Sequence, residues 1–259
     1  MKVLGVIASR YGSSRLPGKA LKDICGRPMI WWVYHSIEGA EGLDKLIVAT
    51  DDQRIVDACN EYGIETVMTR SDHREAANRL QEVSQTIEAD YYIQINGDEP
   101  LLSQDYIKAI IPRTIDPSIE CGANLITKMT NPVEVMDPSN IKVVFDDNYN
   151  TCYMSRTPIP YPYRSIEFDY YKHIGIIGYT KKMLDFYATH APGKFERIEG
   201  IATLRFTDYR KELKCIEVKD IDSLSVDTQM DLDRIREVIR VKLDAGELQK
   251  HLELMNKGK

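Results

Sequence analysis

The alternation of apolar and polar positions over the first part of the chain predicts strands that take turns with helices. Four short apolar runs are typical of buried strands: "KVLGVIA", "KLIVAT", "ETVMT" and "YYIQIN". Between these runs, apolar residues recur at helical spacing over residues 28–37, 53–62 and 76–88. Strands and helices in this order connect by right-handed crossovers, which place helices on both faces of a parallel sheet. We therefore expect an α/β fold with a mostly parallel sheet flanked by helices.

The pattern is less regular in the second part of the chain. The run "IKVVFD" at residues 141–146 predicts a strand, and "PIPYPY" at residues 158–163 predicts an irregular connection. Residues 125–175 are therefore expected to form a smaller β-rich lobe, or a contact between subunits, within a single domain that spans residues 1–259. Apolar positions at helical spacing predict a core-facing helix over residues 231–243.

Composition narrows the class of protein. Of the 259 residues, 43% are hydrophobic and 29% are charged, which is ordinary for a soluble globular protein. The formal net charge of -6 argues against a nucleic-acid partner, because such proteins carry a basic surface. No apolar stretch approaches the ~20 residues of a membrane span, and the apolar run Val3–Ala8, which Arg10 follows closely, is too short for a secretion signal. We expect a cytoplasmic protein with no nucleic-acid or membrane partner.

The five cysteines show no sign of a disulfide framework or a zinc site. They are far apart, and none has a second cysteine or a histidine at metal-ligand spacing. Thiols that stay reduced are typical of the cytoplasm. We expect all five to be buried as small hydrophobic side chains: Cys25, Cys59, Cys121, Cys152 and Cys215.

Candidate chemistry begins with the loop "ASRYGSSRLPGK", which follows the first expected strand. Three cations, Arg10, Arg15 and Lys19, lie in this short stretch of a chain that is acidic overall. Loops at the carboxyl edge of a parallel sheet face the ligand crevice of α/β proteins. The hydroxyl groups of Ser13 and Ser14 add hydrogen-bond donors for an anion. The loop therefore suits a phosphate chain, and the alternative is a solvated loop whose cations pair with surface carboxylates.

Neither common phosphate-binding motif is present in this loop. The P-loop needs four residues between its glycines and a Ser or Thr after its lysine, whereas five residues separate Gly12 from Gly18. Ala20, which has no hydroxyl group, follows Lys19. The dinucleotide fingerprint GxGxxG is absent as well. The glycines still allow backbone amides to approach an anion, so we interpret the loop as a phosphate site of a third kind.

Two acidic residues complement this cationic loop. Asp98, in "NGDEP", comes directly after the fourth expected strand, and Asp227, in "SVDT", comes just before the last expected helix. Mg²⁺ commonly takes one or two protein carboxylates together with phosphate oxygens, so the two acids and the loop would make a metal–nucleotide site. The alternative is that each acid caps the helix that follows it.

Eight segments, in order along the chain, resemble the successive motifs of the CMP-KDO synthetases (3-deoxy-manno-octulosonate cytidylyltransferases). They are "RYGSSRLPGKAL", "VATDD", "MTRSDH", "NGDEP", "NIKVVFD", "YMSRTPIP", "YKHIGIIGY" and "SVDT". The resemblance implies a Rossmann-like nucleotidyltransferase fold, a homodimer and Mg²⁺ as cofactor. It also implies a reaction in which the 2-hydroxyl of an acidic 2-keto-3-deoxy sugar attacks the α-phosphorus of CTP, so that a CMP-sugar forms and pyrophosphate leaves.

The resemblance also implies which residues meet the nucleotide. Those at matching positions are Ala8, Arg10, Ser13, Arg15, Lys19, Arg79 and Asn96. Arg15 and Lys19 would steady the charge on the departing pyrophosphate. Asp98 and Asp227 would hold Mg²⁺, which neutralises charge and helps to position the reacting groups. Arg15, Lys19 and Asp98 are thus the expected catalytic residues.

Four positions correspond to the family's acceptor site: Arg156, His173, Ala202 and Thr203. The guanidinium group of Arg156 suits a planar carboxylate, which it can bind through two parallel hydrogen bonds. His173 would face the sugar acid as well, although it is alternatively a buried structural histidine.

The sequence departs from the family pattern mainly on the acceptor side. The family's Leu-Glu-Gln-Leu-Arg is "IATLR" at residues 201–205, and Ile177 replaces a tyrosine. In the nucleotide-side loop, Ser-Gly-Thr-Asp/Glu-Arg is "EAANR" at residues 75–79. Because the loss of polar partners for hydroxyl groups changes acceptor choice sharply, we expect a retained nucleotide site and a rebuilt acceptor pocket. Two alternatives stay open: a cytidylyltransferase for another acid, such as a phosphate or phosphonate, and a nucleotide-binding protein without catalysis.

Overall fold

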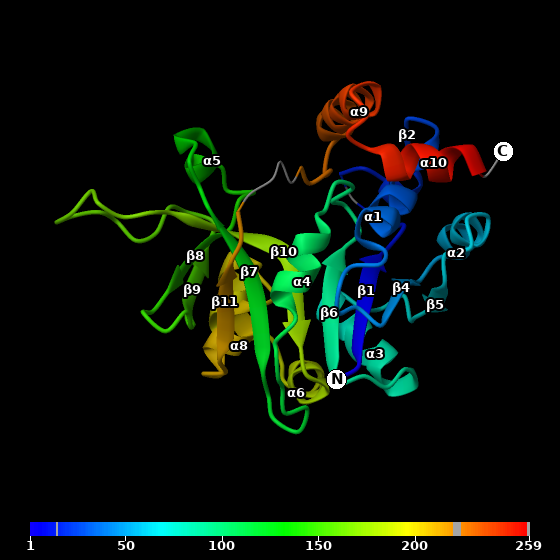
Figure 1. Cartoon of the computed structure of the whole chain (residues 1–259). Helices are drawn as coiled ribbons and strands as arrows, with labels where there is room; N and C mark the ends of the chain where they lie inside the picture. Colours follow the sequence, from blue (N-terminus) through cyan, green and yellow to red (C-terminus); the bar gives the residue numbers. More distant parts are fainter. Residues whose placement is uncertain (14, 220–223, 258–259) are drawn as a thin grey trace.

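A nine-stranded sheet forms the centre of the described structure (Figure 1). The computed structural model of the chain describes residues 1–13, 15–219 and 224–257. The strands of this sheet are β1 (Val3–Ser9), β4 (Lys45–Thr50), β5 (Thr66–Met68), β6 (Tyr91–Asn96), β7 (Gly122–Lys128), β8 (Lys142–Phe145), β9 (Thr151–Ser155), β10 (Tyr171–Tyr179) and β11 (Leu213–Glu217). Their order is β11-β7-β10-β6-β1-β4-β5, with β8 paired to β10 and β9 paired to β8. The four strands predicted in the first part of the chain are β1, β4, β5 and β6, so these predictions are confirmed.

Most neighbouring strands of the sheet are parallel. This holds for β1 with β4 and β6, for β4 with β5, and for β7 with β11. β10 is antiparallel to both β6 and β7, which brings its first residues to the carboxyl end of β6. The expected mostly parallel sheet is confirmed, and the reversed strand β10 can carry residues to the same edge as the loops after β1 and β6.

Helices cover both faces of the sheet (Figure 1). They are α1 (Met29–Ile37), α2 (Gln53–Asn60), α3 (Ala76–Thr86), α4 (Gln104–Ile110), α6 (Lys181–Thr189), α7 (Lys194–Glu199), α8 (Leu204–Asp208), α9 (Gln229–Asp244) and α10 (Gln249–Lys257). Side chains of β1 alternate between two cores: Val3 and Ile7 pack with α1, α4 and α9, whereas Leu4 and Val6 pack with α3, α6 and α8. The predicted helices are α1, α2, α3 and α9, and the expected α/β fold is confirmed.

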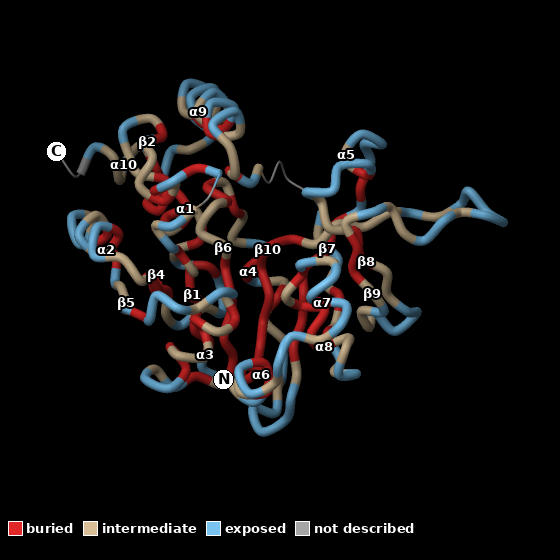
Figure 2. Tube along the Cα trace, turned by 180° about the vertical axis from the view of Figure 1, so that it is seen from behind, coloured by how far each residue is buried: buried red, intermediate tan, exposed pale blue. Residues whose placement is uncertain are grey.

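The lobe expected over residues 125–175 is narrower in the structure. β7 and β10 belong to the central sheet, so the part that stands apart is the β8–β9 hairpin, the short helix α5 (Pro132–Met136) and the connection before β10. That connection extends far from the sheet and is largely exposed, as Figure 2 shows. The sequence indicated β-structure here correctly, but apolar runs alone do not reveal which sheet a strand joins.

Two smaller expectations have mixed outcomes. Cys59 and Cys215 are buried, but Cys25 and Cys121 are only half-buried and Cys152 is exposed, so the prediction of five buried cysteines was wrong. Among the described residues, no helix has both the length and the apolar composition that crossing a membrane requires. A separate two-stranded sheet, β2 (Asp23–Ile24) with β3 (Arg27–Pro28), follows the 3-10 helix η1 (Lys19–Leu21).

Candidate functional site

The cationic loop and Asp98 emerge side by side from the centre of the sheet. Ala8 of β1 is in register with Asn96 of β6, so the loops after the two strands begin at the same edge. A Cβ atom on Gly97 would lie 3.0 Å from the carbonyl oxygen of Ala8, which favours glycine at this close approach. The backbone amide of Val226 donates to the carbonyl oxygen of Asp98 at 2.8 Å. This bond brings the segment before α9 to the same place.

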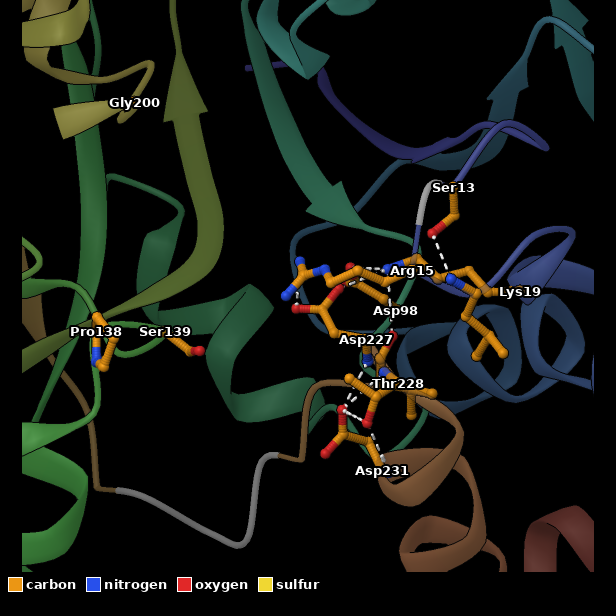
Figure 3. A network of polar contacts seen from close by, with 12 residues as sticks. Ser13, Arg15, Lys19, Asp98, Pro138, Ser139, Gly200, Asp227, Thr228 and Asp231 are labelled. Carbon is orange, nitrogen blue, oxygen red and sulfur yellow. Dashed lines mark hydrogen bonds and ion pairs between the residues drawn. The ribbon is translucent and has the colours of Figure 1, made fainter. Parts of the chain in front are cut away.

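Four charged side chains meet where these segments converge (Figure 3). Lys19 Nζ lies 2.6 Å from Asp98 Oδ2 and 3.1 Å from Asp227 Oδ1. Arg15 donates to Asp227 Oδ2 at 2.9 Å. We call Arg15, Lys19, Asp98 and Asp227 the charge cluster. Two carboxylates that are more than 120 residues apart in the sequence thus share a single ammonium group.

Neither acid of the charge cluster caps a helix. The side chain of Ser103 caps α4, and that of Thr228 caps α9 in a capping box with Asp231. Asp227 lies one residue before that cap and faces Lys19 instead. The capping alternative is therefore wrong for both residues, because hydroxyl side chains already satisfy the helix ends.

The two carboxylates fit a divalent cation. Asp98 Oδ1 is buried and has no hydrogen-bond partner among the described residues, so one hard oxygen is available while Oδ2 contacts Lys19. The ammonium group of Lys19 marks a position where one cation touches both acids. The described residues contain no group of three acidic, histidine or cysteine side chains that could hold a metal ion. Mg²⁺ does not need such a group when phosphate oxygens and water complete its shell.

A cleft of about 260 Å³ opens above the charge cluster and gathers most of the predicted nucleotide residues. The predicted residues that line it are Ala8, Arg10, Ser13, Arg15, Lys19, Asn96, Asp98 and Asp227. Arg79 lines an adjoining cavity of about 180 Å³, which shares Ala8 and Arg10 with the first. Buried Arg79 donates to Thr69 and pairs with Asp51 at 3.0 Å, so its guanidinium is held in place. Ser14 lies outside the described residues.

A second cleft, of about 310 Å³, meets the first at the charge cluster. The two share Arg15, Asn96, Asp98 and Asp227. The far wall of the second cleft is formed by Ser139, Asn140, Ile141, Lys172 and His173. Figure 3 shows Ser139 across from Arg15 and Asp227. The charge cluster therefore lies at the boundary between two ligand-sized spaces.

The second cleft continues into a cavity of about 180 Å³, which we call the distal cavity. The two spaces share Asn96, Ile141 and His173. Ala202 and Thr203 line the distal cavity, so three of the four predicted acceptor residues come together in one continuous space. Its other lining residues are Glu75, Ala76, Ala77, Gln94, Ile177, Tyr179, Tyr187, Gly200 and Ile201.

The chain also matches a family of known proteins over most of its length. The family described as Cytidylyltransferase matches residues 4–221. This chain belongs to the cytidylyltransferase family.

Relatives of this cytidylyltransferase cover almost its whole length. It is 38% identical over 241 residues to the 3-deoxy-manno-octulosonate cytidylyltransferase of Fusobacterium nucleatum, an overlap of 93% of this chain and 98% of that one. It is 37% identical over 236 residues to the 8-amino-3,8-dideoxy-manno-octulosonate cytidylyltransferase of Shewanella frigidimarina, covering 90% and 96% of the two chains. A solved structure of CMP:2-keto-3-deoxy-manno-octonic acid synthetase complexed with CTP superposes with a TM-score of 0.87 at 35% identity, covering 93% of this chain and 100% of that one. The resemblance to CMP-KDO synthetases is confirmed.

The surroundings of His173 are compatible with both alternatives that the sequence left open, and its contact with the sugar acid stays a prediction. His173 lines both acceptor-side spaces, yet its Nδ1 lies 2.7 Å from Asn124 Oδ1 on β7. Burial lowers the pKa of His173 to about 4, so the imidazole of this cytidylyltransferase is neutral near pH 7. Gly175, two residues later, leaves room for neighbours: a Cβ atom there would lie 2.3 Å from Asn96 Nδ2.

Arg156 lies behind the acceptor-side wall and is not among the residues that line either space. Its guanidinium donates to three backbone carbonyls, those of Pro138 at 3.0 Å, Glu199 at 2.9 Å and Gly200 at 3.4 Å. It thereby connects the turn before Ser139, which lines the second cleft, with the turn at Gly200, which lines the distal cavity. Carboxylate binding by Arg156 stays a prediction, and it would require these bonds to be exchanged.

Sequence reasoning missed Lys142, Tyr11 and Arg54. Lys142 is fully buried and donates to the carbonyls of Asp137 at 2.9 Å and Asn140 at 2.7 Å. These bonds hold the turn that forms part of the far wall of the second cleft. The lysine within the apolar run "IKVVFD" was the available signal. The guanidinium of Arg54 stacks 3.3 Å from the ring centre of Tyr11 and holds the cationic loop against α2. No residue pattern marked that pair.

Proposed function

We propose that this cytidylyltransferase transfers CMP from CTP to an acidic 2-keto-3-deoxy sugar of the octulosonate type and releases pyrophosphate. The observation that carries the proposal is the charge cluster at the boundary of two clefts. A triphosphate in the first cleft and a sugar acid in the second would meet at Asp98 and Asp227. The relatives' printed names support an octulosonate acceptor and differ in whether it carries an amino group.

The chain's own residues would perform the transfer by charge and position. In the step, the 2-hydroxyl oxygen of the acceptor forms a bond to the α-phosphorus of CTP, the hydroxyl proton is lost, and the bond to the β-phosphate breaks. Arg10 and Ser13 would hold the phosphate chain from the loop side, and Arg15 and Lys19 would stabilise the negative charge that gathers on pyrophosphate. No covalent enzyme intermediate is needed, because binding both substrates at one boundary supplies proximity.

We propose Mg²⁺ as the cofactor, held by Asp98 and Asp227. When bound, it would neutralise charge on the phosphates and orient them for in-line displacement. Lys19 now pairs with both acids, so arrival of the metal would free its ammonium group for the phosphates. The buried, unpartnered Asp98 Oδ1 supports this assignment.

The experiment is a pyrophosphate-release screen that crosses CTP, ATP, GTP and UTP with four acids. The acids are KDO, its 8-amino analogue, a sugar phosphate and a phosphonate. We expect release with CTP and an octulosonate in the presence of Mg²⁺, with product mass equal to acceptor plus CMP. Release only with the phosphate or phosphonate would replace the acceptor class, and no release with any pair would favour a non-catalytic nucleotide-binding protein.

Two further proposals concern the setting of the reaction. Free cysteines and CTP dependence support a cytoplasmic location. Apolar side chains exposed on α5 and on the projecting connection support a homodimer: Val133, Met136, Tyr161, Tyr163 and Ile166. Light scattering of the purified protein measures the mass that decides the second point.

A further inference from the structure

Glu75 occupies the point where three cavities meet. It lines the cavity next to Arg79, the distal cavity and a larger cavity of about 610 Å³ that residues 188–192 also line. No other described residue lines all three. Glu75 is the residue before α3, yet its side chain caps no helix amide. The carboxylate is thus available to whatever enters these spaces.

The surroundings of this carboxylate leave it without a partner. The backbone carbonyl of Glu75 accepts from the amide of Asn78 at 3.2 Å, but its side chain has no hydrogen bond or ion pair with the other described residues. Burial and the neighbouring carboxylate of Glu196 raise the pKa of Glu75, while the positive charges of Arg10 and Arg205 act in the opposite direction. Glu196 is itself paired with Arg205 at 2.6 Å. The side chain of Glu75 is exposed, so its carboxylate, which has no protein partner among the described residues, can exchange water for a hydrogen-bond donor that a ligand brings to it.

The distal cavity is otherwise uncharged. Of its described lining residues, Glu75 alone carries a charge, and the wall that includes Ala202 offers a methyl group. The resemblance to CMP-KDO synthetases implies a serine at the position of Glu75 and a glutamate at the position of Ala202. Both positions line the same cavity here. The two departures therefore exchange the position of one acid. This chain has the acid at Glu75, before α3, and has none at Ala202, before α8.

We propose that Glu75 determines acceptor specificity by accepting a hydrogen bond from a hydroxyl or ammonium group at the end of the sugar acid remote from its carboxylate. The inference rests on the proposed function, since it takes the second cleft and the distal cavity as the acceptor site. The reacting end would lie at the charge cluster, and the remote end would pass Asn96 and His173 to reach Glu75. Position 75 thereby does the work of an acid at position 202.

The first test measures KM for each substrate separately. Glu75→Gln keeps the shape and removes the charge, and Glu75→Ser shortens the side chain. We expect KM for the acceptor to rise on the order of tenfold in both, with KM for CTP within about twofold of the wild type. Glu88→Gln, an exposed acid after α3, is the matched control and should change neither. A rise in KM for CTP instead would assign Glu75 to the nucleotide and overturn the proposal.

The second test moves the acid across the cavity. Ala202→Glu alone should impair acceptor binding, because two carboxylates would then face one small space. The double variant Glu75→Ser/Ala202→Glu should recover KM to within about threefold of the wild type, which a structural role of Glu75 would not produce. Serine is a good N-cap, so Glu75→Ser should unfold at the wild-type temperature or above it. Double-variant losses that simply add would contradict the inference.

KDO and its 8-amino analogue distinguish the two donors. If the donor is an ammonium group, the wild type prefers the amino acceptor and Glu75→Gln abolishes that preference. If the donor is a hydroxyl, the wild type uses KDO at least as well as the amino analogue, and Glu75→Gln raises KM for both acceptors by the same factor. A wild type that turns over no octulosonate refutes the proposed function itself, whereas an active wild type with indifferent Glu75 variants refutes only this inference.

Discussion

The proposed nucleotide side and the proposed acceptor side of the site are built in different ways. On the nucleotide side, functional residues leave the ends of adjacent parallel strands, and a few short-range contacts place them. On the acceptor side, the walls are turns held by cations that donate to backbone carbonyls, as half-buried Arg156 and buried Lys142 do. The first construction would preserve the geometry of the proposed phosphate and metal site, while the second would let the lining change without moving the reacting centre.

Substitution of Asp98 should have the largest effect on turnover, because Asp98 belongs to the charge cluster, which both sides of the site share. Asp98→Asn keeps the shape but weakens a metal ligand, and we expect kcat to fall on the order of 10³-fold or more. Calorimetry with Mg²⁺ and CTP should show metal binding weakened in parallel. Asp105→Asn, an exposed acid on α4, is the control. Turnover and Mg²⁺ affinity near those of the wild type would remove Asp98 from the metal site.

Substitution of Lys19 tests whether the nucleotide side promotes the reaction through its positive charge. Lys19→Ala should lower kcat on the order of 10²-fold or more, since charge on the departing pyrophosphate would lose a partner. Lys19→Arg keeps the charge with a different shape and should recover part of the loss. Lys45→Ala, which breaks a surface pair with Glu65, is the control. Single-turnover rates measure the chemical step directly, and an unchanged rate in Lys19→Ala would exclude the clamp.

The same contrast explains what the sequence could predict. Asp98 and the cationic loop were predictable because strand ends have local signals and parallel strands share an edge. The meeting of Lys19 with Asp227 was expected as well, because a cationic loop and an acid before the last helix suit one metal–nucleotide site, although 207 intervening residues separate the two side chains. Arg156 shows what the sequence could not predict. A guanidinium group can donate to a carboxylate or to a backbone carbonyl, and the conformation of the nearby turns decides which one it contacts. For the same reason the cavity that Glu75 and Ala202 share could not be read from their positions.

Substitution of Arg156 distinguishes two alternative roles of this residue on the acceptor side: holding the turns in place and binding the substrate. Arg156→Gln should raise KM for the acceptor about tenfold, because the turns at Pro138 and Gly200 would lose their common donor. The effect should be the same with an acceptor whose carboxylate is replaced by a carboxamide, if Arg156 acts through the wall. Lys142→Met, which releases the carbonyls of Asp137 and Asn140, should act in the same direction. A loss confined to the carboxylate acceptor would establish direct binding by Arg156.

The smallest expected effect concerns pH on the acceptor side. Because burial holds the pKa of His173 at about 4, the imidazole stays neutral from pH 8 to pH 5, and KM for the acceptor should carry no histidine step in that range. Folding stability behaves otherwise. The unfolded chain takes up this proton near pH 6.5 and the folded chain only near pH 4, so the stability from neutral His173 is present above 6.5 and is lost as the pH falls toward 4.

His173→Gln should therefore flatten part of the decline in unfolding free energy between pH 6.5 and 4, as measured by urea denaturation. His251 must be substituted in both proteins as a background, because burial lowers its pKa to about 4 as well. A KM profile with a midpoint near pH 6.5 that disappears in His173→Gln would mean that the imidazole titrates in contact with the acceptor. The wall around His173 would then be more open to water than the contact of His173 with Asn124 indicates. The view that the acceptor side is a set of firmly held turns would have to be abandoned.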